Sequence, residues 1–195
     1  MSNAKRTALA LRLVAAVAAV SLWGVGGGGN YEDRACGNFS WNVDHERALF
    51  RGAPLKLTAA QDAATAPELQ PDRLYALALN RQEEVHLLMP PGGKKKPGDG
   101  AFAGLVHLQV PSAGLYRIAL GRSAWVDVLS EQHTIAASDF THSPVCYAPH
   151  KVVEFTLPAG ELVLELTGAT SQRIELTLTR APPAKDEATA GTPKS

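Results

Sequence analysis

Residues 115–129 read Leu-Tyr-Arg-Ile-Ala-Leu-Gly-Arg-Ser-Ala-Trp-Val-Asp-Val-Leu, and residues 74–88 read Leu-Tyr-Ala-Leu-Ala-Leu-Asn-Arg-Gln-Glu-Glu-Val-His-Leu-Leu. The two stretches align without a gap, and residues 162–178 follow the same pattern. Each is an alternating run, a short polar break and a second alternating run, which is the pattern of a β-hairpin. We therefore predict three β-hairpins in an all-β protein.

The predicted strands have one apolar face and one largely polar face. Apolar side chains occupy alternate positions, as at Tyr116, Ile118 and Leu120. The opposite positions carry polar side chains, among them Arg117, Asp127, Glu154 and Glu165. An antiparallel sheet with one buried and one solvated face has this alternation. We predict an all-β fold, an antiparallel two-sheet β-sandwich that is jelly-roll-like.

One short helix is expected ahead of the strands, over residues 42–50. Asn42 or Asp44 can cap its first turn, and Val43, Arg47 and Phe50 fall at helical spacing. Trp41 stands directly before this segment, where it would pack the helix onto the body.

The N-terminus has the features of an export signal. Lys5 and Arg6 precede a mostly apolar run over residues 13–25, and this order is typical of a secretory signal. The run is short for a membrane span, which needs about 20 apolar residues. We predict that the protein is periplasmic or secreted.

The chain then divides into four parts. These are a signal peptide, or an N-terminal anchor, over 1–26, a flexible lead-in over 27–35, one β-sandwich domain over 36–180 and a disordered tail over 181–195.

The charge balance argues against nucleic acid as a partner. The chain has 19 basic and 19 acidic residues, and loss of the signal removes Lys5, Arg6 and Arg12 but no acidic residue. Binding to nucleic acid depends on neutralising phosphates with a basic surface. We expect no nucleic-acid partner, and membrane contact only through the N-terminal segment if it stays uncleaved.

Two cysteines, Cys36 and Cys146, are present. In an exported chain a pair of cysteines favours one disulfide. The alternative is that Cys146 binds a metal or stays free. By the chain-entropy estimate, so long a closed loop stabilises the fold by up to about 4–5 kcal/mol.

Two further runs carry a family resemblance. Residues 102–120 read Phe-Ala-Gly-Leu-Val-His-Leu-Gln-Val-Pro-Ser-Ala-Gly-Leu-Tyr-Arg-Ile-Ala-Leu, and residues 153–166 read Val-Glu-Phe-Thr-Leu-Pro-Ala-Gly-Glu-Leu-Val-Leu-Glu-Leu. They resemble bacterial pre-peptidase C-terminal domains and carbohydrate-binding modules of the β-sandwich type. The resemblance implies an accessory binding role. The Asp-rich calcium positions of many such modules have no counterpart here.

A cluster over residues 139–150 holds His142, Cys146 and His150, and side chains of these types bind copper or zinc. The piece Cys-Tyr-Ala-Pro-His resembles part of the copper loop of cupredoxins, but no Met follows at the expected distance. We expect no metal and no cofactor, and keep this loop as the alternative.

Three aromatic residues are candidate ligand contacts. Trp125 shares strand parity with Asp127, so it should project from the outer face, where an indole ring can stack on a sugar or a partner side chain. Tyr147 and Trp41 are the other two. The competing interpretation is packing, for Trp125 at a sheet edge or beside Trp41 and for Tyr147 around the disulfide. No motif for nucleophilic catalysis is present, so no catalytic residue is predicted.

Taken together, these features predict an exported binding or interaction module without enzymatic activity, with an unknown protein or glycan as its ligand. The alternatives are a copper- or zinc-binding periplasmic protein and a structural envelope component held by an uncleaved N-terminus.

Overall fold

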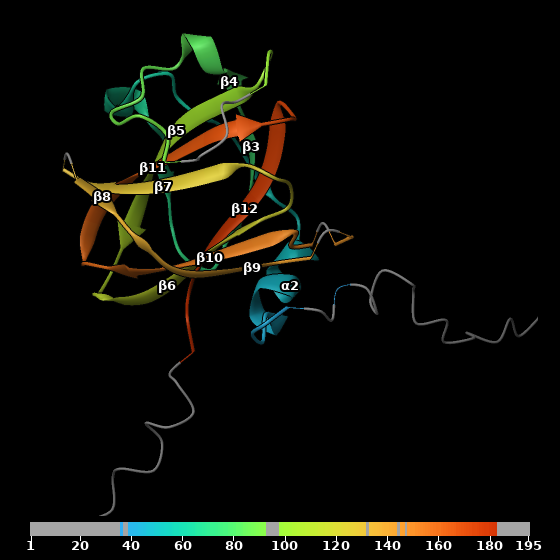
Figure 1. The fold of residues 1–195 in the computed structure, drawn as a ribbon. Coiled ribbons are helices and arrows are strands. Elements are labelled where there is room, and N and C mark those ends of the chain that lie inside the picture. The colour runs from blue at the N-terminus through green and yellow to red at the C-terminus, as the bar shows by residue number, and fades with distance from the viewer. Residues whose placement is uncertain are drawn as a thin grey trace, which may run out of the picture.

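The computed structural model describes residues 36, 39–92, 98–131, 133–143, 145–146 and 148–182. They form two β-sheets that pack face to face, with one short α-helix against the outside of one of them (Figure 1). The predicted signal peptide, the lead-in and nearly all of the predicted tail lie outside the described residues. Among the described residues, no helix has the length and apolar character that crossing a bilayer requires.

Sheet A has six strands. In spatial order they are β1 (Leu55–Thr58), β3 (Leu74–Ala78), β12 (Arg173–Arg180), β6 (Gly114–Leu120), β10 (Lys151–Leu157) and β9 (Ala137–His142). All pairs are antiparallel except β1 with β3, which is parallel.

Sheet B lies opposite. Its strands in spatial order are β2 (Glu68–Leu69), β5 (Phe102–Val110), β11 (Gly160–Ala169), β7 (Trp125–Ser130) and β8 (His133–Ile135), and β4 (Asn80–Arg81) also pairs with β5. Between the strands lie the 3₁₀ turns η1 (Ala63–Thr65) and η2 (Gln82–Glu84).

The strand order is that of a jelly roll, so the predicted fold class is confirmed. From β5 onward the chain crosses between the sheets at residues 111–113, 121–124, 136, 158–159 and 170–172. Neighbours within a sheet are therefore strands far apart in sequence, such as β12 between β3 and β6. This wrapping of the chain distinguishes a jelly roll from a stack of hairpins.

The prediction that these three stretches form β-hairpins is wrong, because the two strands in each stretch do not pair with each other. β6 and β7 lie in different sheets, and so do β11 and β12. In the first stretch β3 is followed only by the two-residue β4 and by η2. The physical reason is that a crossing turn and a hairpin turn both need a polar break, and both leave the flanking apolar faces directed at the same core.

The predicted apolar faces form the main core between the sheets. Tyr116, Ile118 and Leu120 of β6 are fully buried there with the alternate residues of β10, β11 and β12. The buried Tyr116 hydroxyl donates to the carbonyl of Ser112 at 2.9 Å, which satisfies its polar end. The second run of the first predicted hairpin, which ends at residue 88, forms no strand, and Val85 and Leu87 pack in a separate cluster over sheet B.

The outer faces are less solvated than predicted. Arg117, Asp127 and Glu165 are buried although they alternate with core residues. Sheet A is covered by the helix α2 (Asp44–Phe50) with Val43, and sheet B by residues around 59–66 and 85–92. The alternation determines which side chains face outward. Chain segments without a strand pattern determine which of those side chains remain exposed to solvent.

Helix α2 begins two residues later than predicted. Asn42 accepts a hydrogen bond from the Asp44 amide at 2.8 Å, so it ends the preceding turn, while Val43 holds the N-cap position. Val43 and Phe50 face sheet A, as their helical spacing indicates.

Candidate functional site

Trp125 opens strand β7 at the end of the sandwich where two turns, 121–124 and 170–172, carry the chain between the sheets. The next residue, Val126, points into the core, so Trp125 points outward, as its parity predicts. Its side chain is 41% exposed. Among the described residues, β8 pairs with β7 only at residues 128–130, so no β8 partner flanks the ring on that side.

Lys151 supports the indole ring from the opposite sheet. Its Nζ lies 5.4 Å from the centre of the Trp125 ring and donates to the carbonyl of Ala124 at 3.2 Å. Burial lowers the pKa of Lys151, and the charge of Asp127 acts against that shift. A cation at this distance is attracted by the ring face, so Lys151 both links the two sheets and holds the ring in place.

Gly92 packs against the same ring. A Cβ at this position would lie 2.9 Å from Oδ1 of Asp127 and 3.3 Å from Nε1 of Trp125. Only a residue without a side chain fits this approach comfortably. We call residues 85–92 the covering segment, because they lie over the outer face of sheet B.

Two carboxylates hold the covering segment down. Asp127 and Glu165 are direct partners across β7 and β11. Asp127 Oδ2 accepts the amide of Gly92 at 3.1 Å, and Glu165 Oε1 accepts the amide of Leu88 at 2.6 Å. They act as acceptors for a segment that has no strand partner of its own.

Glu165 is fully buried, and its Oε2 has no hydrogen-bond partner among the described residues. Burial raises the pKa of Glu165, hydrogen bonds from the amides of Leu88 and Met89 oppose this, and the charge of Asp127 adds to it. Paired carboxylates with one raised pKa are a feature of glycosidases. Here Glu165 is out of reach of a substrate, so the pair has a structural task.

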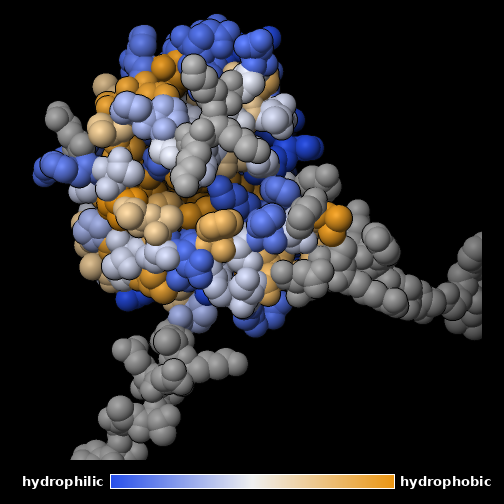
Figure 2. All heavy atoms as spheres, in the orientation of Figure 1, coloured by the Kyte–Doolittle hydropathy of each residue, from blue (hydrophilic) through white to orange (hydrophobic). Residues whose placement is uncertain are grey.

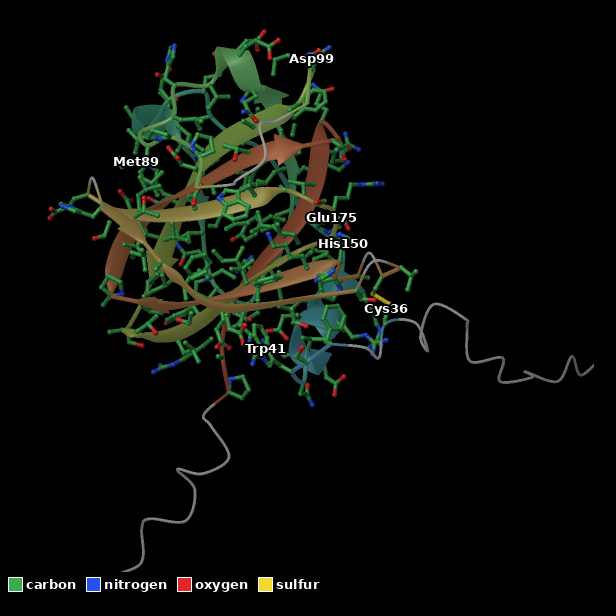
Figure 3. The ribbon with its side chains drawn as sticks, in the orientation of Figure 1. Cys36, Trp41, Met89, Asp99, His150 and Glu175 are labelled. Atoms are coloured by element: carbon green, nitrogen blue, oxygen red, sulfur yellow. A yellow bond between two sulfur atoms is a disulfide. The ribbon has the colours of Figure 1, made fainter. Side chains whose placement is uncertain are left out.

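A polar hollow of about 200 Å³ lies at the same end of the sandwich. It is lined by Gly121, Arg122, Ser171, Arg173 and Glu175. The amide of Gly121 donates to the carbonyl of Glu175 at 2.8 Å, which joins the two crossing turns. Glu175 and His150 are labelled close together at this end in Figure 3.

The hollow and the indole ring are connected by one short turn. Gly121 and Arg122 belong to the hollow, while Ala124 holds the Lys151 ammonium and Trp125 follows directly. The turn 121–124 thus places a guanidinium on one side and an aromatic ring on the other. Gly121, Arg173 and Glu175 alternate with core residues of sheet A, so the hollow opens over sheet A, whereas the ring projects from sheet B. We refer to the Trp125–Lys151 pair alone as the turn-end surface.

Large apolar side chains are otherwise exposed singly. Besides Trp125, the exposed ones within the described part of the chain are Leu55, Leu88, Leu115, Phe140 and Val145. Figure 2 shows one face of the molecule, on which apolar groups are divided by hydrophilic residues. Scattered apolar residues of this kind are normal for a protein surface, which leaves the turn-end surface as the best candidate site.

Trp41 has a packing role. It is half-buried over sheet A beside α2 (Figure 3), and the Arg117 guanidinium lies 5.0 Å from its ring centre. Trp41 and Trp125 therefore lie over different sheets. Tyr147, the third predicted aromatic contact, lies outside the described residues.

A buried ion network ties the N-terminal segment to sheet A. Arg117 donates to Glu154 at 3.0 Å and to the carbonyl of Asn42 at 2.9 Å, and lies 3.9 Å from the buried Glu46. Thr179 donates to Glu46 at 2.7 Å. The sequence pattern assigned Arg117 to a solvated face, but it is the anchor of α2.

Cys36 and Cys146 form the disulfide that the sequence favours, with their Cα atoms 5.2 Å apart. The alternative metal loop would need Cys146 as a thiolate, which the disulfide removes. His150 Nδ1 lies 3.1 Å from the Cys146 carbonyl, and His142 stacks on Phe140. In the described part of the chain, no three His, Cys, Asp or Glu side chains gather to hold a metal ion.

No family model matches the chain, and comparison with curated proteins finds no match either. The candidate site therefore rests on its own geometry. Of its members, sequence reasoning found Trp125 but not Lys151, which stands at a strand start without any motif. Gly92 could have been noticed, because a Pro-Pro-Gly-Gly segment at residues 90–93 permits a close backbone approach.

Proposed function

We propose that this protein is an exported, non-catalytic binding module whose ligand is a glycan, contacted by the Trp125 ring. The observation that carries this proposal is that the ring is both exposed and held in a fixed position. It is 41% exposed, yet it is fixed between the backbone at Gly92 and the ammonium of Lys151. A rigid exposed aromatic ring loses little conformational entropy when it stacks on a flat sugar face.

The surroundings of the ring support a polar ligand. The Lys151 ammonium lies 5.4 Å from the ring centre, and the Asp127 carboxylate lies beside Gly92 on the same face of sheet B. Sugar hydroxyl groups need such donors and acceptors, since a buried hydroxyl without a partner costs free energy. A ring together with polar groups fits a sugar better than a wholly apolar ligand.

Binding without catalysis is supported by the chemistry of the cluster. Glu165 is closed off from solvent by the covering segment, Asp127 accepts the Gly92 amide, and the Lys151 ammonium beside the ring donates to a carbonyl. Export is supported by the N-terminal sequence, and a disulfide suits the oxidising compartments outside the cytoplasm.

A glycan array tests the proposal. The full chain, W125A and F140A would be applied to the same array, F140A being matched because Phe140 is even more exposed, at 59%, and lies on the edge strand β9. We expect binding to a subset of glycans that W125A loses and F140A keeps. Equal binding by W125A, or no binding by the native chain, would contradict the proposal.

A protein ligand is the other class that the sequence leaves open. In that case a pull-down from an envelope fraction would recover a partner through the same ring, and the array would stay negative. The two experiments together separate the glycan proposal from this alternative.

A further inference from the structure

The hollow at the end of sheet A takes no part in the proposed glycan contact. It opens on the outer face of that sheet, whereas the Trp125 ring projects from sheet B. Helix α2 covers the same face of sheet A over Leu74, Ala119 and Val152. Gly121 lies two residues beyond Ala119 and has no side chain, so it contributes only backbone to the wall of the hollow.

Two opposite charges stand near each other in this hollow without forming a pair. Arg173 and Glu175 both line it (Glu175 is labelled in Figure 3), and they lie on one face of β12. Their Cα atoms are about 6.5 Å apart, since they are two residues apart on a strand. In the part of the chain that the structure describes, neither the Arg173 guanidinium nor the Glu175 carboxylate has an ion pair or a side-chain hydrogen bond. Both charges are therefore available to a ligand.

Two further side chains complete the lining of the hollow. Arg122 comes from the turn after β6 and adds a second guanidinium. Ser171 comes from the turn before β12, and its Oγ accepts the amide of Arg173 at 3.3 Å. The hydroxyl hydrogen of Ser171 can then be donated to a ligand. The lining thus carries two positive charges, one negative charge and one hydroxyl donor.

These charges select a particular chemistry. A guanidinium presents several N–H donors in a fixed plane and binds a carboxylate with two parallel hydrogen bonds. The carboxylate of Glu175 repels a second carboxylate and attracts an ammonium. The volume of about 200 Å³ is smaller than the roughly 300–1,000 Å³ of sites for drug-sized ligands. A small molecule with two carboxylates and one ammonium satisfies all three charged side chains.

We propose that this hollow is a second ligand site, which binds an acidic amino acid. The two carboxylates of the ligand bind Arg122 and Arg173, and its ammonium binds Glu175. Ser171 donates its hydroxyl hydrogen to one of the carboxylates. The site lies over the other sheet from Trp125, so it goes beyond the proposed function and does not depend on it.

The experiment is a titration of the ¹⁵N-labelled full chain, monitored by amide chemical shifts, with L-glutamate, glutarate and L-glutamine in turn. Glutarate lacks the ammonium, and L-glutamine has an amide in place of one carboxylate. We expect L-glutamate to shift the amides of residues 121–122 and 171–175. Glutarate and L-glutamine should bind at least about tenfold more weakly, because each loses one set of charge-assisted hydrogen bonds.

Variants assign the charges to their residues. E175Q should remove the preference for L-glutamate over glutarate, and R173Q should weaken binding of both at least about tenfold. The matched controls are E68Q and R51Q, which remove the same charges from exposed residues outside the hollow and should bind as the native chain does. Circular dichroism and thermal unfolding confirm that each variant is folded.

Three results would overturn the inference. The first is the absence of shifts in the native chain at millimolar L-glutamate, or shifts centred away from the hollow. The second is equal binding of L-glutamate and glutarate by the native chain, which would make the hollow a general anion site. The third is equal weakening by the control variants, which would indicate a general charge effect. None of these results concerns glycan binding at Trp125, which the glycan array tests separately.

Discussion

Glu165 and Asp127 stand opposite each other on β11 and β7, and each accepts a backbone amide from the covering segment. Like charges in direct cross-strand contact are unfavourable. The pair persists because it satisfies donors that would otherwise be buried unpaired. It also keeps Gly92 against the Trp125 ring, so it links a buried feature of the fold to the proposed ligand surface.

The first prediction concerns the pH dependence of stability. Burial raises the pKa of Glu165 in the folded protein above its usual value of 4.5, which holds in the unfolded chain. At pH values between these two, the native state therefore binds more protons than the unfolded chain does. Stability from this group therefore falls as pH rises from about 4.5 through the raised folded-state pKa. E165Q should be more stable than the native chain at pH 7, and this advantage should vanish near pH 4.

Urea unfolding at the two pH values measures this difference. E165A is the comparison, since it leaves the Leu88 amide unpaired and should cost about 1–3 kcal/mol at both. If E165Q were as destabilising as E165A at pH 7, the carboxylate would not be an unfavourably buried charge.

The second prediction concerns the approach of Gly92 to the ring. In G92A the new Cβ would meet Asp127 Oδ1 and Trp125 Nε1, and we expect a loss of about 1 kcal/mol in stability from overpacking with weaker glycan binding. G98A is the matched control, because a Cβ there has nothing within 4 Å. Equal free energies of unfolding for the two variants in urea would show that the covering segment can shift away from the ring without a loss of stability.

The third prediction concerns Arg117. In R117A the carboxylates of Glu46 and Glu154 lose their buried cation, and removal of one partner from such a network costs about 3–5 kcal/mol. The exposed Arg51 offers a control, R51A, which should stay within about 0.5 kcal/mol of the native chain. A loss below about 1 kcal/mol for R117A would mean that the network contributes little to holding α2.

The fourth prediction concerns the disulfide. C36S/C146S should lower the free energy of unfolding by up to about 4–5 kcal/mol, since the bond closes a loop of 110 residues. The β-sheet spectrum should remain at low temperature, because Arg117 and the Ser40–Thr141 hydrogen bond still hold the N-terminal segment. A double variant unfolded at all temperatures would show that these contacts do not suffice.

The sequence predicts the layers of the fold better than its pairings. Alternation placed Tyr116, Ile118 and Leu120 in the core, because a strand on a sandwich must bury one face. It could not show that β6 and β7 belong to different sheets, since hairpins and crossings share the same polar break. That choice depends on contacts between strands distant in sequence, such as β12 with β3 and β6.

The candidate site was predicted only in part for a related reason. Trp125 is visible from its parity, which is a local property. Glu165 has the same outward parity but is buried, because the covering segment folds over it. Lys151 reaches the Trp125 ring only because the start of β10 and the turn 121–124 meet at one end of the sandwich.

The measurement that tests the central claim most directly is a titration of the ¹⁵N-labelled chain with a glycan that the array identifies, monitored by amide chemical shifts. The account predicts shifts at residues 90–92, 124–127 and 151, with little change along β9 or at residues 98–101. Shifts centred elsewhere, or none at millimolar ligand, would contradict the assignment of the turn-end surface as the binding site.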